Sequence, residues 1–75
     1  MPRYSNLSGD SGVIAYETSP DSITLAFANG DRYLYSHAGP GRDAVERMKA
    51  LAKAGRGLST FVSRHVRDNY ERKLD

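Results

Sequence analysis

The sequence has no cysteine, and no hydrophobic run in its 75 residues approaches the roughly 20 residues that cross a membrane. Without cysteine, neither a disulfide framework nor a thiolate metal site can form, and small secreted proteins usually depend on one of the two. The first ten residues also lack the apolar stretch of a secretory signal. We therefore expect a cytoplasmic protein that does not interact with membranes.

The residues that are present have the composition of one small globular domain. Hydrophobic residues make up 39% and charged residues 27%, which lies outside the range typical of disordered chains. A chain of this length has room for a single hydrophobic core. We expect a flexible N-terminal segment at residues 1–10 and one domain over residues 11–72.

The net charge of +2 is divided unevenly along the chain. Residues 1–41 carry two basic and four acidic side chains, a net charge of −2, whereas residues 42–75 carry nine basic and five acidic ones, a net charge of +4. An anionic partner would therefore be attracted to the C-terminal half.

The first half of the sequence predicts three strands. Val13–Tyr16 is rich in β-branched and aromatic residues and is closed by a turn at Pro20. Residues 23–27 alternate large apolar with small or polar side chains, so the large ones share one face of a half-buried strand. Asn29-Gly30 then signals a hairpin that leads into a third strand at Arg32–Tyr35.

The loop of this hairpin decides where Tyr33 and Tyr35 lie. A two-residue type I′ loop at Asn29-Gly30 places both tyrosines on the face away from the large apolar residues of the second strand. A three-residue loop, Ala28–Gly30 with a glycine bulge, places them on the same face as those residues. The three-residue loop gives all strands one shared apolar face, whereas Leu34 favours the two-residue loop.

The second half changes to a helical period. From Asp43 the spacing of apolar residues predicts a helix of about 12 residues that ends at Gly55. Ser59 or Thr60 is positioned to cap a second helix, whose apolar stripe runs over residues 58–70. We expect an α+β fold, a small antiparallel three-stranded β-meander followed by two α-helices packed on one sheet face.

The sequence contains no recognisable catalytic or metal-binding constellation. His65 and Asp68 fall on neighbouring turns of one helix face, as a base and its orienting acid would, but no placed nucleophile accompanies them. The other histidine, His37, lies in an unrelated loop, and two histidines without a carboxylate cluster cannot complete a metal shell. We expect a protein that is not an enzyme and has no metal or cofactor.

One connection has features of an anion site. Gly55–Gly57 precedes the second helix, and helix N-termini bind anions through free N–H groups and the dipole. Arg56, Ser59 and Thr60 would offer one charge and two hydroxyl groups to a phosphate. The alternative interpretation is a plain connector, since the loop matches no phosphate-binding fingerprint.

The basic half and the tyrosine strand are candidate nucleic-acid contacts. Cations without acidic neighbours would neutralise phosphates, and the alternative is an ordinary solvated helix surface of mixed charge. Two tyrosines on one strand face would stack bases if that face is exposed and pack in the core if it is covered. The candidate nucleic-acid-binding residues are Tyr33, Tyr35, Lys53, Arg56, Arg64 and Arg67.

Three motifs of the chain resemble the KTSC domain, a short domain found at the C-terminus of some lysyl-tRNA synthetases and as free-standing bacterial proteins. They are a Phe-x-x-Gly-x-x-Tyr run at residues 27–33, a Tyr-x-Tyr element at residues 33–35, and a segment from Gly57 through Val66-Arg67 to Tyr70. The similarity covers roughly residues 11–72. The family has no established function, and its association with the synthetase implies RNA binding.

Two functions from different classes follow as expectations. The first is a small non-catalytic module that binds RNA, either tRNA or a single strand, through a basic helical face and the Tyr-x-Tyr strand. The alternative is a protein–protein interaction or self-association module, because a domain this small often leaves one sheet face uncovered for a protein partner or for a homodimer.

Overall fold

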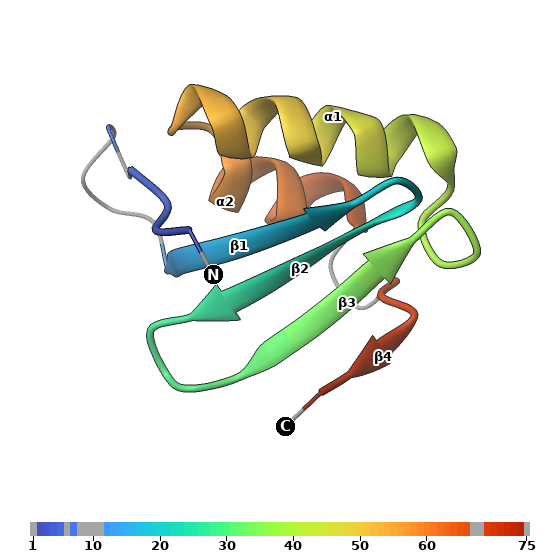
Figure 1. The fold of residues 1–75 in the computed structure, drawn as a ribbon, viewed down its shortest axis with the longest axis horizontal. Coiled ribbons are helices and arrows are strands. Elements are labelled where there is room, and N and C mark those ends of the chain that lie inside the picture. Colours follow the sequence, from blue (N-terminus) through green and yellow to red (C-terminus); the bar gives the residue numbers. More distant parts are fainter. Residues whose placement is uncertain (1, 6, 8–11, 67–68, 75) are drawn as a thin grey trace.

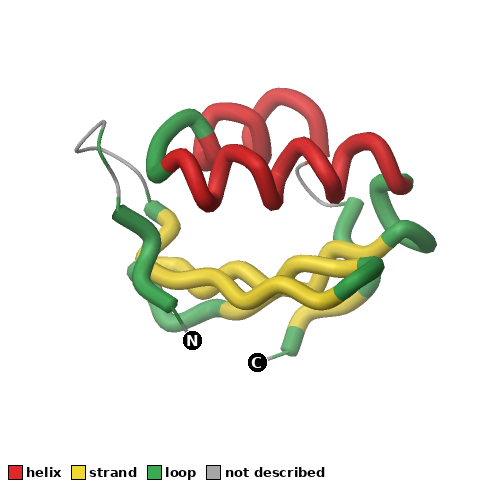
Figure 2. Tube along the Cα trace, turned by 45° about the horizontal axis from the view of Figure 1, so that its top comes forward, coloured by secondary structure: helices red, strands yellow, loops and turns green. Residues whose placement is uncertain are grey.

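The computed structural model describes residues 2–5, 7, 12–66 and 69–74, and these form two layers. Figure 1 shows an antiparallel sheet, and Figure 2 shows the helices covering one of its faces. The sheet has the strand order β1-β2-β3-β4, with bounds Val13–Ser19, Ser22–Phe27, Arg32–Ser36 and Arg72–Lys73. The helical layer consists of α1 (Arg42–Ala54), α2 (Leu58–Phe61) and the π-helical turn η1 (Val62–Val66). The predicted α+β class is confirmed.

The sheet has one strand more than the sequence predicted. After η1 the chain returns to the sheet, and β4 pairs with β3 so that Tyr33 lies opposite Lys73 and Leu34 opposite Arg72. The pairing involves only two residues of β4, which is too short to leave a period in the sequence. The expected three-stranded meander is therefore a four-stranded sheet in the part of the chain that the structure describes.

The hairpin between β2 and β3 has the three-residue loop. The Phe27 N–H donates to the Asp31 carbonyl at 2.9 Å, and the Gly30 N–H donates to the Phe27 carbonyl at 3.0 Å. Gly30 has φ 96, a conformation that glycine adopts without steric cost. Leu25 consequently faces Tyr33, which confirms the register in which both tyrosines share the face of the large apolar residues.

The hydrophobic core lies between the two layers. Ile23 and Leu25 of β2, Val45 and Met48 of α1, and Leu58 of α2 are all 0% exposed. Burial of one such side chain stabilises a fold by about 1.5–3 kcal/mol. Because the apolar residues alternate in β2 and follow the helical period in α1, each element turns one side toward the other layer.

A β-bulge adjusts β1 to this core. Val13 lies opposite Phe27 and Ala15 opposite Ala26, so Ile14 is an extra residue on the β1 side and is 49% exposed. The bulge allows both Val13 and, three residues later, Tyr16 to face the helical layer.

The first helix agrees with its prediction. It spans 13 residues and ends at Gly55, whose left-handed φ of 82 turns the chain. The Gly55 N–H donates to the Leu51 carbonyl at 3.0 Å, which satisfies one of the free carbonyl groups at the helix end.

The second helix begins earlier than predicted. α2 starts at Leu58 after Gly57, and no side-chain hydrogen bond caps it. Ser59 and Thr60 therefore lie inside the helix, and the prediction that one of them is the cap is wrong. The left-handed conformation of Gly57, with φ 82, changes the chain direction before a serine or threonine cap can form.

Tyr70, predicted as the last residue of the helical stripe, lies outside the helix. Its ring packs against Tyr33 and Tyr35, with centroid distances of 4.7 and 6.1 Å. The next residue, Glu71, donates its N–H to the Leu34 carbonyl at 2.7 Å. Pairing with the sheet edge thus takes this segment out of the helix.

Residues 2–5, part of the segment 1–10 that the sequence predicts to be flexible, pack against the domain. Tyr4 is only 5% exposed, and its N–H donates to the Ile14 carbonyl at 2.9 Å. Its neighbour Arg3 forms an antiparallel bridge with Ala15 at the edge of β1. The Tyr4 hydroxyl accepts a hydrogen bond from the Leu58 N–H at 3.3 Å, so this segment joins the sheet to the start of α2.

Candidate nucleic-acid interface

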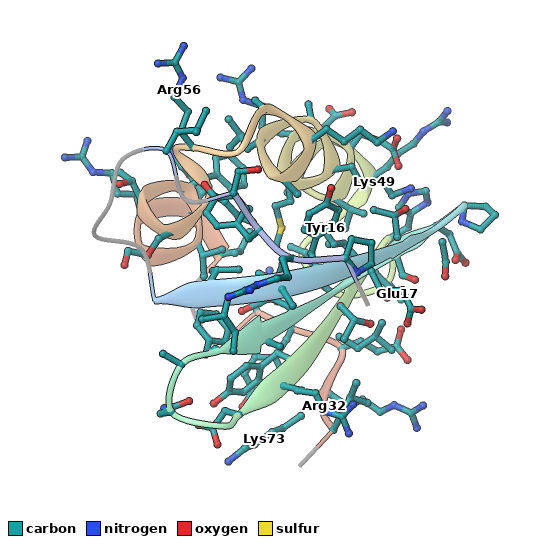
Figure 3. All side chains as sticks on the ribbon, turned by 60° about the vertical axis from the view of Figure 1, so that its left-hand side comes forward. Tyr16, Glu17, Arg32, Lys49, Arg56 and Lys73 are labelled. Carbon is teal, nitrogen blue, oxygen red and sulfur yellow. The ribbon has the colours of Figure 1, made fainter. Side chains whose placement is uncertain are left out.

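The helical layer, residues 42–66, concentrates the positive charge of the protein. It contains six basic and two acidic residues, a net charge of +4 within a third of the chain. Because Val45, Met48 and Ala52 hold the apolar side of α1 against the sheet, the basic side chains are left on the outer surface. Figure 3 shows Arg56 extending away from the fold at the end of the layer, with Arg32 and Lys73 on the opposite side of the molecule.

Among the basic residues of this layer, Lys49 forms an ion pair that neutralises its charge. Its Nζ lies 3.0 Å from Glu46 Oε2 and also donates to the Pro20 carbonyl at 2.9 Å, in the turn between β1 and β2. His37 Nε2 lies 3.2 Å from the same carboxylate oxygen. The hydrogen bond from Lys49 lowers the pKa of Glu46 most, and the one from His37 lowers it further. Lys49 therefore holds α1 to the sheet and is no free cation.

Three predicted phosphate contacts are exposed cations. Lys53, Arg56 and Arg64 all lie on the surface, and no carboxylate of the described residues forms an ion pair with any of them. Arg67 lies outside the described residues. The structure adds Arg47, which is exposed and equally unpaired, although Asp43 four residues earlier is a helical pairing partner in sequence.

The predicted phosphate site at the start of α2 is only partly assembled. Arg56 and Thr60 are exposed, whereas Ser59 is half-buried. The Leu58 N–H, the first free amide of the helix, points inward and donates to the Tyr4 hydroxyl. The site thus offers a charge and a hydroxyl group, but its first amide is already satisfied from inside the fold.

The tyrosine strand provides no platform for bases. Tyr35 is 2% exposed, and Tyr33 is half-buried between Phe27 and Tyr70, at centroid distances of 5.7 and 4.7 Å. The prediction that both tyrosines stack bases is therefore wrong: Tyr35 is buried, and the half-buried ring of Tyr33 already packs against two other rings. The physical reason is the three-residue hairpin loop, which turns both rings toward the helical layer.

Tyr33 has a structural role at the sheet edge. Its hydroxyl donates to Asp31 Oδ2 at 3.3 Å, and Lys73 Nζ lies 5.9 Å from the centre of its ring. Burial raises the pKa of Tyr33, and the Asp31 carboxylate raises it further. Lys73 also pairs with Asp31 at 3.4 Å, so these three residues fasten β4 to β3.

A ring pair that the sequence reasoning did not propose lies on the outer surface of the helical layer. The rings of Phe61 and His65 are 4.7 Å apart and inclined by 33°. Phe61 is half-buried against the core, and His65 is exposed. The signal in the sequence is an aromatic residue and a histidine at the i, i+4 spacing, which brings two side chains together on a helix. Asp68, the predicted orienting acid for His65, lies outside the described residues.

The sheet face opposite the helices carries a second group of charged residues. Figure 2 shows no described element over this open sheet face. The strand register places two rows of side chains across it: Arg3, Ala15, Ala26 and Arg32, and then Glu17, Thr24, Leu34 and Arg72. The small residues Ala15, Ala26 and Thr24 form the floor of this face, which ends at Arg3 and Arg32 in the first row and at Glu17 and Arg72 in the second.

The described residues contain no group of three or more histidine, cysteine, aspartate or glutamate side chains arranged to hold a metal ion. No helix within the described ranges is long and apolar enough to cross a membrane. Comparison of the chain with protein-family models, with curated proteins and with solved structures gives no match.

Proposed function

We propose that this protein is a small non-catalytic module that binds RNA through the outer surface of its helical layer. The observation that carries the proposal is the set of exposed cations of the helical layer without a carboxylate partner among the described residues, namely Arg42, Arg47, Lys53, Arg56 and Arg64. Each phosphate that such a cation neutralises releases condensed counterions, and this release drives non-specific binding to nucleic acids.

The helical layer suits a polyanion better than the open sheet face does. Cations of the layer come from α1, from the connection at Arg56 and from η1, so they cover a broad surface. On the open sheet face Glu17 stands in the same row as Arg72 and would repel a phosphate there. Among the described residues, no carboxylate forms an ion pair with Lys53, Arg56 or Arg64, where a phosphate backbone would follow the helices.

The resemblance to the KTSC domain supports the same proposal. The motifs that carry it include Gly57–Val62, which forms α2 and the start of η1 within the helical layer. We propose membership of that family, and with it an RNA ligand, on the basis of these residues.

The test is the salt dependence of RNA binding measured by fluorescence anisotropy. A Lys53→Gln/Arg56→Gln double variant should bind a labelled single strand more weakly at low salt. Its slope of log affinity against log salt should fall by about 1.4, because each contact with a single strand contributes about 0.7. The matched control is Arg3→Gln/Arg72→Gln, which removes the same charge from the open sheet face and should leave the slope unchanged.

Two results would contradict the proposal. One is an affinity for RNA that does not weaken with salt. The other is an equal loss of affinity in both double variants, because this would show that overall charge matters and the helical layer does not.

The open sheet face favours a second candidate, a protein-interaction module. Leu34 is half-buried at the centre of this face, beside the small residues Ala26 and Thr24. A partner that covers this floor would bury apolar surface that the fold leaves accessible. Self-association that depends on Thr24, the central residue of the floor, would favour this candidate over RNA binding.

A further inference from the structure

His65 differs from every other ring side chain that the structure describes. The rings of Tyr4 and Tyr35 are buried, and those of Phe27, Tyr16, Tyr33 and Tyr70 are partly buried against the core. His37 is half-buried and bound to Glu46. His65 alone among these residues is exposed, so its ring is the most accessible one for stacking a ligand on the described surface.

The ring of His65 is also held in place. One face rests on Phe61, which is itself packed against the core, at 4.7 Å and with a small inclination of 33°. His65 is exposed, and no other ring contact of this side chain is seen among the described residues. A flat ligand on the other face would extend a stack that begins in the core, and less side-chain entropy would be lost because the imidazole is already oriented.

The surroundings of the ring pair suit a nucleotide. Arg64 precedes His65 on η1, is exposed, and forms no ion pair with a described carboxylate. The side chains of Thr60 and Ser63 are exposed on the same helical segment. A ring for the base, a guanidinium for the phosphate and hydroxyl groups for the ribose are thus all exposed within residues 60–65.

From this arrangement we infer that the Phe61–His65 ring pair stacks an unpaired base, with Arg64 at the adjoining phosphate, so that the ligand of the helical layer is single-stranded RNA. The inference rests on the proposed function and narrows its ligand from RNA in general to single-stranded RNA. Bases inside a duplex are stacked on each other and have no accessible face. In a single strand, each base can expose a face to the protein. Selectivity for single strands over duplexes follows.

The test compares two probes that differ only in their bases. One is a labelled oligouridine of about ten nucleotides, and the other is an abasic strand of the same length with the same phosphates. The protein should bind oligouridine more tightly. His65→Ala should lower the affinity for oligouridine by roughly five- to hundredfold and leave the affinity for the abasic strand unchanged.

A second variant separates the ring from any charge of the imidazole. His65→Phe keeps a flat ring but has no ionisable group, so it should retain most of the preference for oligouridine. Circular dichroism of each variant shows that it is folded. If His65→Phe behaves as His65→Ala does, or if the protein binds both probes equally, the stacking inference is wrong.

These outcomes are separable from failure of the proposed function. Equal, salt-dependent binding of both probes would overturn the ring pair as a stacking site and leave the phosphate contacts of the helical layer intact. If no salt-dependent binding to either probe occurs, the proposed function fails and the inference fails with it.

Discussion

At the scale of single residues, Glu46 is the point at which three segments of the chain meet. It accepts hydrogen bonds from Lys49 of α1 and from His37, which follows β3, while Lys49 also reaches the carbonyl of Pro20 between β1 and β2. The His37 N–H donates to the Asp21 carbonyl in the same turn at 3.0 Å. One exposed carboxylate therefore helps to position α1 over one end of the sheet.

The lowered pKa of Glu46 predicts how stability depends on pH. Because the folded protein holds this carboxylate ionised below its ordinary pKa of 4.5, its contribution is complete above that value and is lost as the pH falls through the lower folded value. Glu46→Gln should lower the urea midpoint at pH 7, and the difference from the parent protein should be smaller at pH 3 than at pH 7.

Urea unfolding followed by circular dichroism at both pH values checks this prediction. Glu71→Gln is the matched control, because Glu71 is also exposed and its carboxylate accepts no hydrogen bond from the described residues. A Glu46→Gln variant whose midpoint differs from that of the parent protein by the same amount at pH 7 and at pH 3 would exclude this role for Glu46.

At the scale of elements, two glycines set the direction of the chain between α1 and α2. Gly55 and Gly57 both have φ 82, a conformation that disfavours any residue with a Cβ atom. They differ in their surroundings. A Cβ at Gly55 would lie 2.8 Å from Ser5 Cβ, whereas one at Gly57 would make an ordinary contact of 3.5 Å with Leu51.

The two positions form a matched pair of alanine variants. Each should lose roughly 1 kcal/mol of unfolding free energy from the left-handed backbone alone. Gly55→Ala should lose clearly more, because the N-terminal segment must also shift away from the end of α1. Urea denaturation of the two variants measures the difference, and equal losses would mean that the contact at Ser5 contributes nothing.

At the scale of the whole molecule, both the outer surface of the helical layer and the open sheet face carry positive charge. The helical layer has unpaired cations on the outer side of α1 and η1. The open sheet face has Arg3, Arg32 and Arg72 around small residues, with Glu17 as the acidic side chain in these rows. Three arginines against one glutamate give these rows a net positive charge, so two copies that paired through this face would repel each other.

We therefore expect a monomer in solution. Sedimentation velocity across the micromolar range should give the mass of a single chain both at low and at moderate salt, since like charges on the open sheet face oppose pairing. A dimer that the variant Thr24→Arg dissociates would contradict this expectation and would favour the protein-interaction candidate.

Sequence reasoning succeeded where a local pattern reports a local structure. The helical period and Gly55 predicted α1 and its end, and the alternation in residues 23–27 predicted the buried face of β2. It was less successful where a contact between residues distant in sequence determines the secondary structure. The segment at Tyr70 continues a helical stripe in sequence, yet β3 and its tyrosines attract it to the sheet edge.

For the candidate interface too, one part was predictable from the sequence and another depended on distant contacts. The sequence by itself determined that positive charge gathers in the C-terminal half, because charge is a property of composition. Only the tertiary structure decided which cations form ion pairs: Lys49 pairs with Glu46 and donates to the Pro20 carbonyl, whereas no carboxylate of the described residues, Asp43 included, pairs with Arg47.

Which aromatic ring lies on the surface also depends on the tertiary structure. The sequence left two registers open for the β2–β3 hairpin, and they place Tyr33 on opposite faces of the sheet. The fold has the register that buries the Tyr33 ring, because this register puts Ile23, Leu25, Tyr33 and Tyr35 on the face that the helical layer covers, although it leaves Leu34 on the open face. The ring left on the surface is that of His65, which Phe61 supports from inside the fold.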